Sequence, residues 1–229
     1  MFGHVQPTPY DLSFSLFGIP VRVLPWFWLM AIVMGFDLFQ IPGRGPALLL
    51  AWVVIVFVSI LIHELGHATA ALLFGYPPRI LMYHFGGLAM FEPHWGYTAA
   101  KSIIISLAGP GAGFVFYGIT RAVRFVMERG GTEISPFAGF VFGKLEWVNL
   151  CWGLVNLLPV HPLDGGQVCR EVLTSLNAQR GMRWTLYVGV ATGAAAAAVA
   201  FYYDERYAAI LMGALAIGCY MELQERQSW

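Results

Sequence analysis

The stretch "VVIVFVSILIHELGHATAALLFG", residues 53–75, decides the fold because it joins a membrane-length apolar run to a metal-binding pattern. The run extends over residues 46–74. A helix needs about 20 apolar residues to cross the hydrocarbon core of a bilayer, so this one is long enough. The pattern HELGH lies in its C-terminal half. Ionisable side chains are costly inside lipid, and where they occur in a spanning helix they indicate function.

The composition of the whole chain agrees with a membrane protein. Hydrophobic residues make up 58% of the 229 residues and charged residues 11%, whereas soluble domains are about 25% charged. The formal net charge is zero and the basic residues are scattered, so the sequence predicts no nucleic-acid partner. We therefore expect an integral, multi-pass membrane protein.

Apolar segments predict transmembrane helices, and the expected fold class is an all-α polytopic membrane protein with about six spans. The segments are residues 26–41, 46–74, 102–127, 137–158, 184–203 and 207–221. No internal repeat, linker or soluble-domain boundary separates them. We expect a single membrane-embedded domain over residues 1–229, with the motif-bearing core at about 46–170.

Two shorter stretches predict membrane-associated β-hairpins. Residues 12–24, "LSFSLFGIPVRVL", alternate partly around a Gly-Ile-Pro turn, and residues 80–93, "ILMYHFGGLAMFEP", place Gly86 and Gly87 between two apolar runs. A glycine pair suits a tight hairpin turn. Because non-helical backbone survives at membrane depth only beside protein or water, both hairpins should lie at an interface or inside the bundle.

The HELGH pattern predicts a zinc site on the second segment. His63 and His67 are four residues apart, so a helix places both imidazoles on one face, one turn apart. Two such histidines bind one zinc ion, and the glutamate beside the first, Glu64, can take a proton from water.

A catalytic zinc site needs a third protein ligand and one open position. The candidates are His84, Glu92, His94, His161 and Asp164. Asp164 is favoured because residues 156–168, "NLLPVHPLDGGQV", contain prolines that break the helix, and two glycines after Asp164 allow an unusual backbone path. The second and fourth segments run parallel, so Asp164 and HELGH approach the same membrane face. His161 meets this condition too and stays a rival.

These residues resemble the site-2 protease family of intramembrane zinc metalloproteases. The match consists of HExxH at residues 63–67 and the family's Asn-x-x-Pro…Asp-Gly pattern at Asn156, Pro159, Asp164 and Gly165. Residues 106–114, "SLAGPGAGF", are similar to the family's third core helix, although Gly113 stands where the family often has Asn. The resemblance covers about residues 13–170 and implies the bare core form, without a PDZ or CBS domain.

The resemblance implies a zinc metalloendopeptidase that hydrolyses a peptide bond within or near the transmembrane segment of a membrane protein. By position, His63, His67 and Asp164 would bind one Zn²⁺. Glu64 would be the general base, and Asn156 would hold the substrate or stabilise the oxyanion. The expected partners are single-pass transmembrane protein substrates and the lipid bilayer.

The family pattern also places both termini and the active-site opening on the cytosolic side of the membrane. The hairpin at residues 80–91 would bind substrate if an exposed edge of it paired with an unwound substrate strand; the alternative is a hairpin that only fills the helix bundle. Two alternatives stay open. A membrane zinc peptidase of the prenyl-processing type would take a Glu or His from a later helix as third ligand, and a non-catalytic membrane scaffold would not need Glu64.

Overall fold

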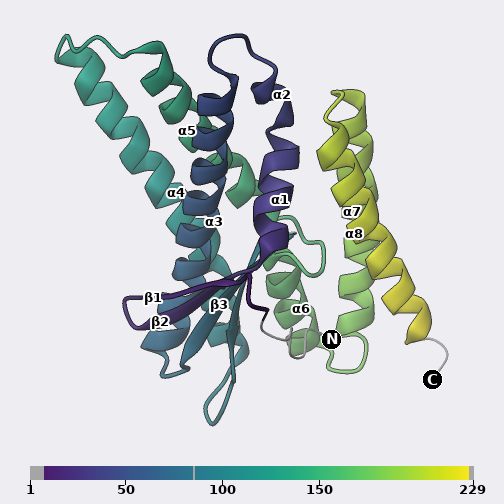
Figure 1. Cartoon of the computed structure of the whole chain (residues 1–229). Coiled ribbons are helices and arrows are strands. Elements are labelled where there is room, and N and C mark those ends of the chain that lie inside the picture. The colour runs from purple at the N-terminus through teal and green to yellow at the C-terminus, as the bar shows by residue number, and fades with distance from the viewer. Residues whose placement is uncertain (1–7, 85, 227–229) are drawn as a thin grey trace. The chain divides into compact units, whose positions relative to one another are not determined.

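The computed structural model describes residues 8–84 and 86–226 (Figure 1). Residues 1–7, 85 and 227–229, which include both termini and one residue of the expected 80–91 hairpin, lie outside the described residues. The chain divides into two compact units. The first is Met1–His94 with Ala112–Leu150, and the second is Trp95–Gly111 with Cys151–Trp229. The expected single domain over residues 1–229 stays a prediction.

The expected polytopic helical fold is confirmed, with a small sheet in addition. The helices are α1 (Pro25–Met34), α2 (Phe36–Phe39), α3 (Gly45–Leu73), α4 (Ala99–Arg129), α5 (Pro136–Asn156), α6 (Asp164–Leu176), α7 (Gly181–Tyr202) and α8 (Arg206–Glu225). In the described part of the chain, α3, α4, α7 and α8 are long and apolar enough to cross a membrane. The chain is thus an integral membrane protein, but the expected count of six spans is not confirmed.

The first expected span, residues 26–41, was wrong as a single helix, because it forms α1 and α2. Trp52 of α3 fills the space beside Gly35, where α1 ends, and its Nε1 donates a hydrogen bond to the carbonyl of Ala31 at 3.0 Å. A Cβ at Gly35 would lie 2.7 Å from that nitrogen. The 10 residues of α1 rise about 15 Å, about half the thickness of a bilayer core.

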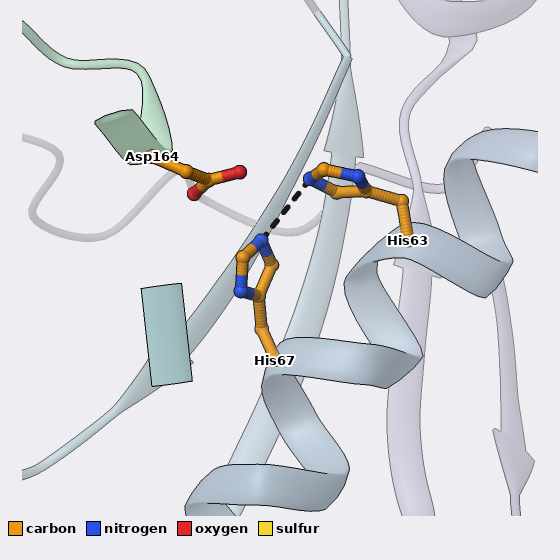
Figure 2. A group of neighbouring side chains, drawn as sticks. All are labelled: His63, His67 and Asp164. Carbon is orange, nitrogen blue, oxygen red and sulfur yellow. Dashed lines mark hydrogen bonds between the residues drawn. The ribbon is translucent and has the colours of Figure 1, made fainter. Parts of the chain in front are cut away.

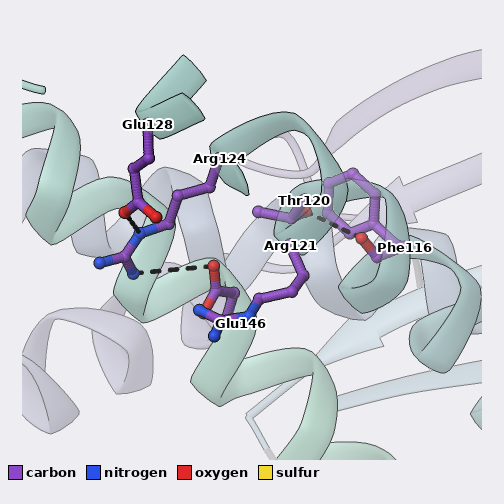
Figure 3. A network of polar contacts seen from close by, with 6 residues as sticks. All are labelled: Phe116, Thr120, Arg121, Arg124, Glu128 and Glu146. Carbon is purple, nitrogen blue, oxygen red and sulfur yellow. Dashed lines mark hydrogen bonds and ion pairs between the residues drawn. The ribbon is translucent and has the colours of Figure 1, made fainter. Parts of the chain in front are cut away.

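Helix α5 has 21 residues, but Lys144, Glu146 and Asn149 lower its hydropathy. The side chain of Glu146 is 13% exposed and lies against two arginines of α4. One oxygen, Oε2, accepts from Arg121 Nη1 at 3.5 Å, and Oε1 lies 3.7 Å from Arg124 Nη1 (Figure 3). These ion pairs compensate a carboxylate that an apolar helix could not otherwise carry.

In the second unit, α7 packs along α8, and α6 contacts α7 (Figure 1). The core of this unit consists of Val160, Leu186, Cys219 and Leu223. Val160 lies in the turn between α5 and α6 and is fully buried. The turn that leads into Asp164 is therefore held by apolar contacts with α7 and α8.

In the first unit, four strands form one sheet in the order β1 (Leu12–Leu16), β2 (Ile19–Val23), β3 (Pro78–Tyr83) and β4 (Gly86–Phe91). The two expected hairpins are present as antiparallel pairs, and β2 and β3 join them in parallel. Every second residue of β2 is buried, as period-two alternation predicts. Helix α3 contacts both β3 and β4, and α1 contacts β3.

Both turns lie at residues other than the expected ones. The turn of the first hairpin is at Phe17 and Gly18, which have φ of 51° and 80°, whereas Ile19 and the following proline belong to β2. In the second hairpin Tyr83 pairs with Gly86, so both glycines belong to β4 and not to the turn. Gly87 is needed in the strand for space, since Glu64 of α3 packs directly against it.

Candidate metal centre

Helix α3 brings His63 and His67 together as the sequence predicts. Both are buried, and their Nε2 atoms lie 3.1 Å apart. The rings are 4.8 Å apart at an angle of 79°, and Figure 2 marks the contact between the two nitrogens. Two nitrogens at about 2.0–2.1 Å from one tetrahedral zinc ion are about 3.3 Å apart. The pair therefore fits two corners of a zinc site.

Figure 2 also shows Asp164 beside the two histidines. The ligand atoms of the three residues all lie within 4.8 Å of one another. Two imidazoles and a carboxylate are a donor set that catalytic zinc uses, with the fourth position open. Within the described residues no other group of three or more such side chains meets this condition.

Asp164 is the first residue of α6 and follows Leu163, the N-cap. The expectation that Gly165 and Gly166 allow an unusual backbone path was wrong, because both are helical and neither has a positive φ. They are needed for close packing. A Cβ at Gly165 would overlap the carbonyl of Leu157, and one at Gly166 would lie 2.6 Å from the carbonyl carbon of Val160. Small residues thus let α6 begin directly on the preceding turn.

Glu64 is buried on α3, and its carboxylate lies beside the sheet. Burial, and then the negative charge of Glu64, raise the pKa of the Tyr83 phenol on β3. The carboxylate is therefore enclosed by the two strands on which α3 packs. A carboxylate next to two metal-binding imidazoles can act as a general base.

The other candidates for a third ligand lie in different surroundings. His84 and Glu92 are exposed. His94 Nε2 is 3.2 Å from the carbonyl of Gly75. His161, the rival of Asp164, has its Nε2 4.0 Å from Glu222 Oε2 within the second unit. Among the described residues, only Asp164 joins His63 and His67 in a group of potential metal ligands.

Asn156 ends α5 and is buried. Its Nδ2 donates to the carbonyl of Trp152 at 2.9 Å, one turn earlier in the same helix. This bond uses one of the two amide hydrogens and fixes the orientation of the group. A role for Asn156 toward substrate stays a prediction.

Sequence reasoning missed a buried polar contact behind the histidines. Asn149 of α5 donates from Nδ2 to Ser59 Oγ of α3 at 2.9 Å and to the carbonyl of Leu145 at 2.9 Å. Ser59 lies one turn before His63 on α3, so three polar residues at spacing four mark one face of an otherwise apolar helix. That spacing is the feature of the sequence that could have indicated this contact. It places a hydrogen bond between helices directly next to the first histidine.

Comparison with known proteins decides the family. Residues 131–196 match the model of peptidase family M50. A Synechocystis protein named as a candidate zinc metalloprotease is 35% identical over 199 residues, which cover 81% of this chain. A continuous stretch of that extent includes residues 63–67 and 164. The chain thus contains a peptidase family M50 domain.

Other relatives of this M50 chain agree with the assignment. A zinc metalloprotease of Methanocaldococcus jannaschii is 27% identical and covers 70% of the chain. Stage IV sporulation protein FB of Bacillus subtilis is 28% identical and covers 66%. The M50 chain spans about half the length of the curated relatives that it matches, 50% of the first and 44% of the second.

A solved structure shows the same fold. The site-2 protease from Methanocaldococcus jannaschii matches with a TM-score of 0.64 at 21% identity, covering 93% of the M50 chain and 95% of that chain. The expected membership of the site-2 protease family is confirmed. The names of the family and the relatives support a zinc metalloprotease, and the histidine pair with Asp164 could bind the metal.

Proposed function

We propose that this chain is an intramembrane zinc metalloprotease, which hydrolyses a peptide bond within or near the transmembrane segment of a membrane protein. The observation that carries the proposal is the pair of buried imidazole nitrogens, 3.1 Å apart, on the most apolar membrane-length helix. Glu64 lies beside them, and Asp164 supplies the third donor.

In the proposed mechanism, His63, His67 and Asp164 would hold one zinc ion. Zinc bound there would supply Lewis-acid chemistry and acidify water. Glu64 accepts a proton from the attacking water and later donates it to the nitrogen of the leaving amine, which is general acid–base catalysis. Asn156, whose amide is oriented by its bond to Trp152, donates its second N–H to the oxygen of the scissile carbonyl.

The open edge of β4 is the proposed binding site for an unwound substrate strand. Residues 80–82 of β3 pair with β2 on one side and with β4 on the other, so the exposed edge of the 80–91 hairpin is the edge of β4. In the described sheet, β4 is a terminal strand that pairs with β3 alone. Its second edge can hydrogen-bond to an added strand by β-augmentation.

Zinc binding is the first test of the proposal. Purified protein should bind one equivalent of zinc, and His63→Ala and Asp164→Ala should each reduce binding at limiting zinc. His94→Ala is the matched control, because this histidine contacts a backbone carbonyl away from the metal ligands. Zinc binding that is equal in all variants would refute the site. Loss in His63→Ala but full retention in Asp164→Ala would favour the prenyl-processing alternative.

Cleavage of a co-expressed single-pass membrane protein is the second test. Wild type should release a product, and Glu64→Gln should not, although it still binds zinc. A product that appears equally with Glu64→Gln would refute the catalytic role and favour the non-catalytic scaffold. Proline introduced singly along β4 should impair cleavage, whereas proline at Ser13 or Ser15 of β1, the other terminal strand, should not.

The orientation is part of the proposal. We propose that the opening of the active site faces the cytosol. Single cysteines placed in the exposed loop at Glu92 and at Asp204, between α7 and α8, should react differently with a membrane-impermeant thiol reagent. Glu92 should be labelled from the cytosolic side and Asp204 from the opposite side if α4, α5 and α7 all cross the membrane. Labelling of both from one side would contradict this proposed orientation.

A further inference from the structure

Gly87 of β4 packs against the side chain of Glu64, and both residues belong to the first unit. A Cβ built on Gly87 would lie 2.6 Å from Cδ and 2.6 Å from Oε1 of Glu64, and it would overlap Cγ. Ordinary contact begins at about 3.4 Å. The carboxylate of Glu64 thus occupies the volume that any side chain at position 87 would need.

Backbone conformation does not explain this glycine. Gly87 has no positive φ, unlike its neighbour Gly86 with φ of 130°. It pairs with Met82, next to the Tyr83–Gly86 pair that ends the β3–β4 ladder, and its backbone there could carry any residue with a side chain. Space is the requirement at Gly87, and the side chain that fills the space is Glu64.

The contact is with the side chain of Glu64 and not with backbone. The atoms that a Cβ would meet are Cγ, Cδ and Oε1, and these atoms can rotate about the side-chain torsions of Glu64. An alanine at position 87 would therefore displace the carboxylate by about 0.8 Å or more, while the strand and α3 keep their places. Such a substitution changes where the carboxylate lies without removing it.

We propose that Gly87 is a positioning residue, which holds the Glu64 carboxylate in its reactive place by leaving room for it against β4. The inference rests on the proposed function, in which Glu64 transfers the proton. A general base must lie within hydrogen-bonding reach of the proton that it takes. A misplacement of about 1 Å costs about 100-fold in rate.

The test compares Gly87→Ala with wild type in zinc binding, thermal stability and steady-state cleavage. The expected result is a fall in kcat of about 100-fold, with KM, zinc content and melting temperature unchanged. Gly118→Ala on α4 is the matched control, because a Cβ there meets nothing within 4 Å. It should behave as wild type in every assay.

A second background separates positioning from a structural role. Glu64→Ala removes Cγ, Cδ and Oε1, the three atoms that a Cβ at position 87 would meet. In a Glu64→Ala background, where no carboxylate remains to be displaced, Gly87→Ala should leave the melting temperature unchanged, even if it lowers that of wild type.

Several results would overturn the inference. Wild-type kcat in Gly87→Ala would do so. A rise in KM alone would assign Gly87 to substrate pairing, and an equal loss of stability with and without Glu64 would assign it to the fold. Full activity of Glu64→Gln would instead refute the proposed function, independently of Gly87.

Discussion

Replacing Gly165 with alanine should weaken zinc binding by moving Asp164. Gly165 follows Asp164 directly in the first turn of α6, and its Cα faces the carbonyls of Leu157 and Leu158. A Cβ at this position would lie 2.6 Å from the oxygen of Leu158 and would overlap that of Leu157. Both are backbone atoms, so no side chain can rotate away.

The size of the effect follows from this geometry. Restoring a contact of 3.4 Å to the Leu158 oxygen requires the first turn of α6 to withdraw by about 0.8 Å, and the overlapping Leu157 oxygen requires a larger shift. Ligand distances at a metal site tolerate about 0.2 Å, so Asp164 would leave its place. We expect zinc affinity to fall about 10–100-fold, which corresponds to about 1.4–2.8 kcal/mol.

Competition for zinc with a chromophoric chelator measures this affinity, and thermal unfolding of the same sample reports on the fold. Gly143→Ala on α5 is the control, because a Cβ there meets nothing within 4 Å. Unchanged zinc affinity in Gly165→Ala would refute the argument that close packing positions Asp164. Equal affinity in Gly165→Ala and Asp164→Ala would show that the substitution removes the ligand completely.

Three further substitutions test the packing around the site. Glu146→Gln should lower stability, because it removes the largely buried carboxylate that two arginines of α4 contact; an unchanged denaturation midpoint would contradict this. Asn149→Leu and Ser59→Ala should show a coupling of about 1 kcal/mol in a double-mutant cycle, and strict additivity would show that the bond contributes nothing. Gly189→Ala should destabilise, since its Cβ would lie 2.8 Å from Cys219 Sγ. Adding Cys219→Ala to Gly189→Ala should then restore the melting temperature, and failure to do so would refute this contact as the cause.

Apolar segment length predicted α3 well, since residues 46–74 were expected and the helix is Gly45–Leu73. The packing at Gly35 could not be predicted, because Trp52, a residue of another helix, fills the space beside this glycine. Local hydropathy carries no information about which side chain will lie beside a given backbone atom.

The sheet, too, has features that the sequence predicts and features that it does not. Alternation predicted the strands, but the parallel pairing of Val21 with Ile80 joins residues far apart in sequence and leaves no local signal. Gly86 and Gly87 were expected in a turn because glycine pairs favour turns. Gly87 instead lies in β4, where Glu64 of α3 takes the space of a side chain.

By itself, the sequence determined that this chain enters a membrane and that His63, Glu64 and His67 share one turn of a spanning helix. Both follow from properties that act locally, namely the cost of polar groups in lipid and the period of the helix. Only the tertiary structure decided that β3 has no open edge, that Asn149 bonds to Ser59, and that the carboxylate of Glu64 rests on Gly87. These depend on which surfaces meet, and steric contact between distant segments is settled by packing.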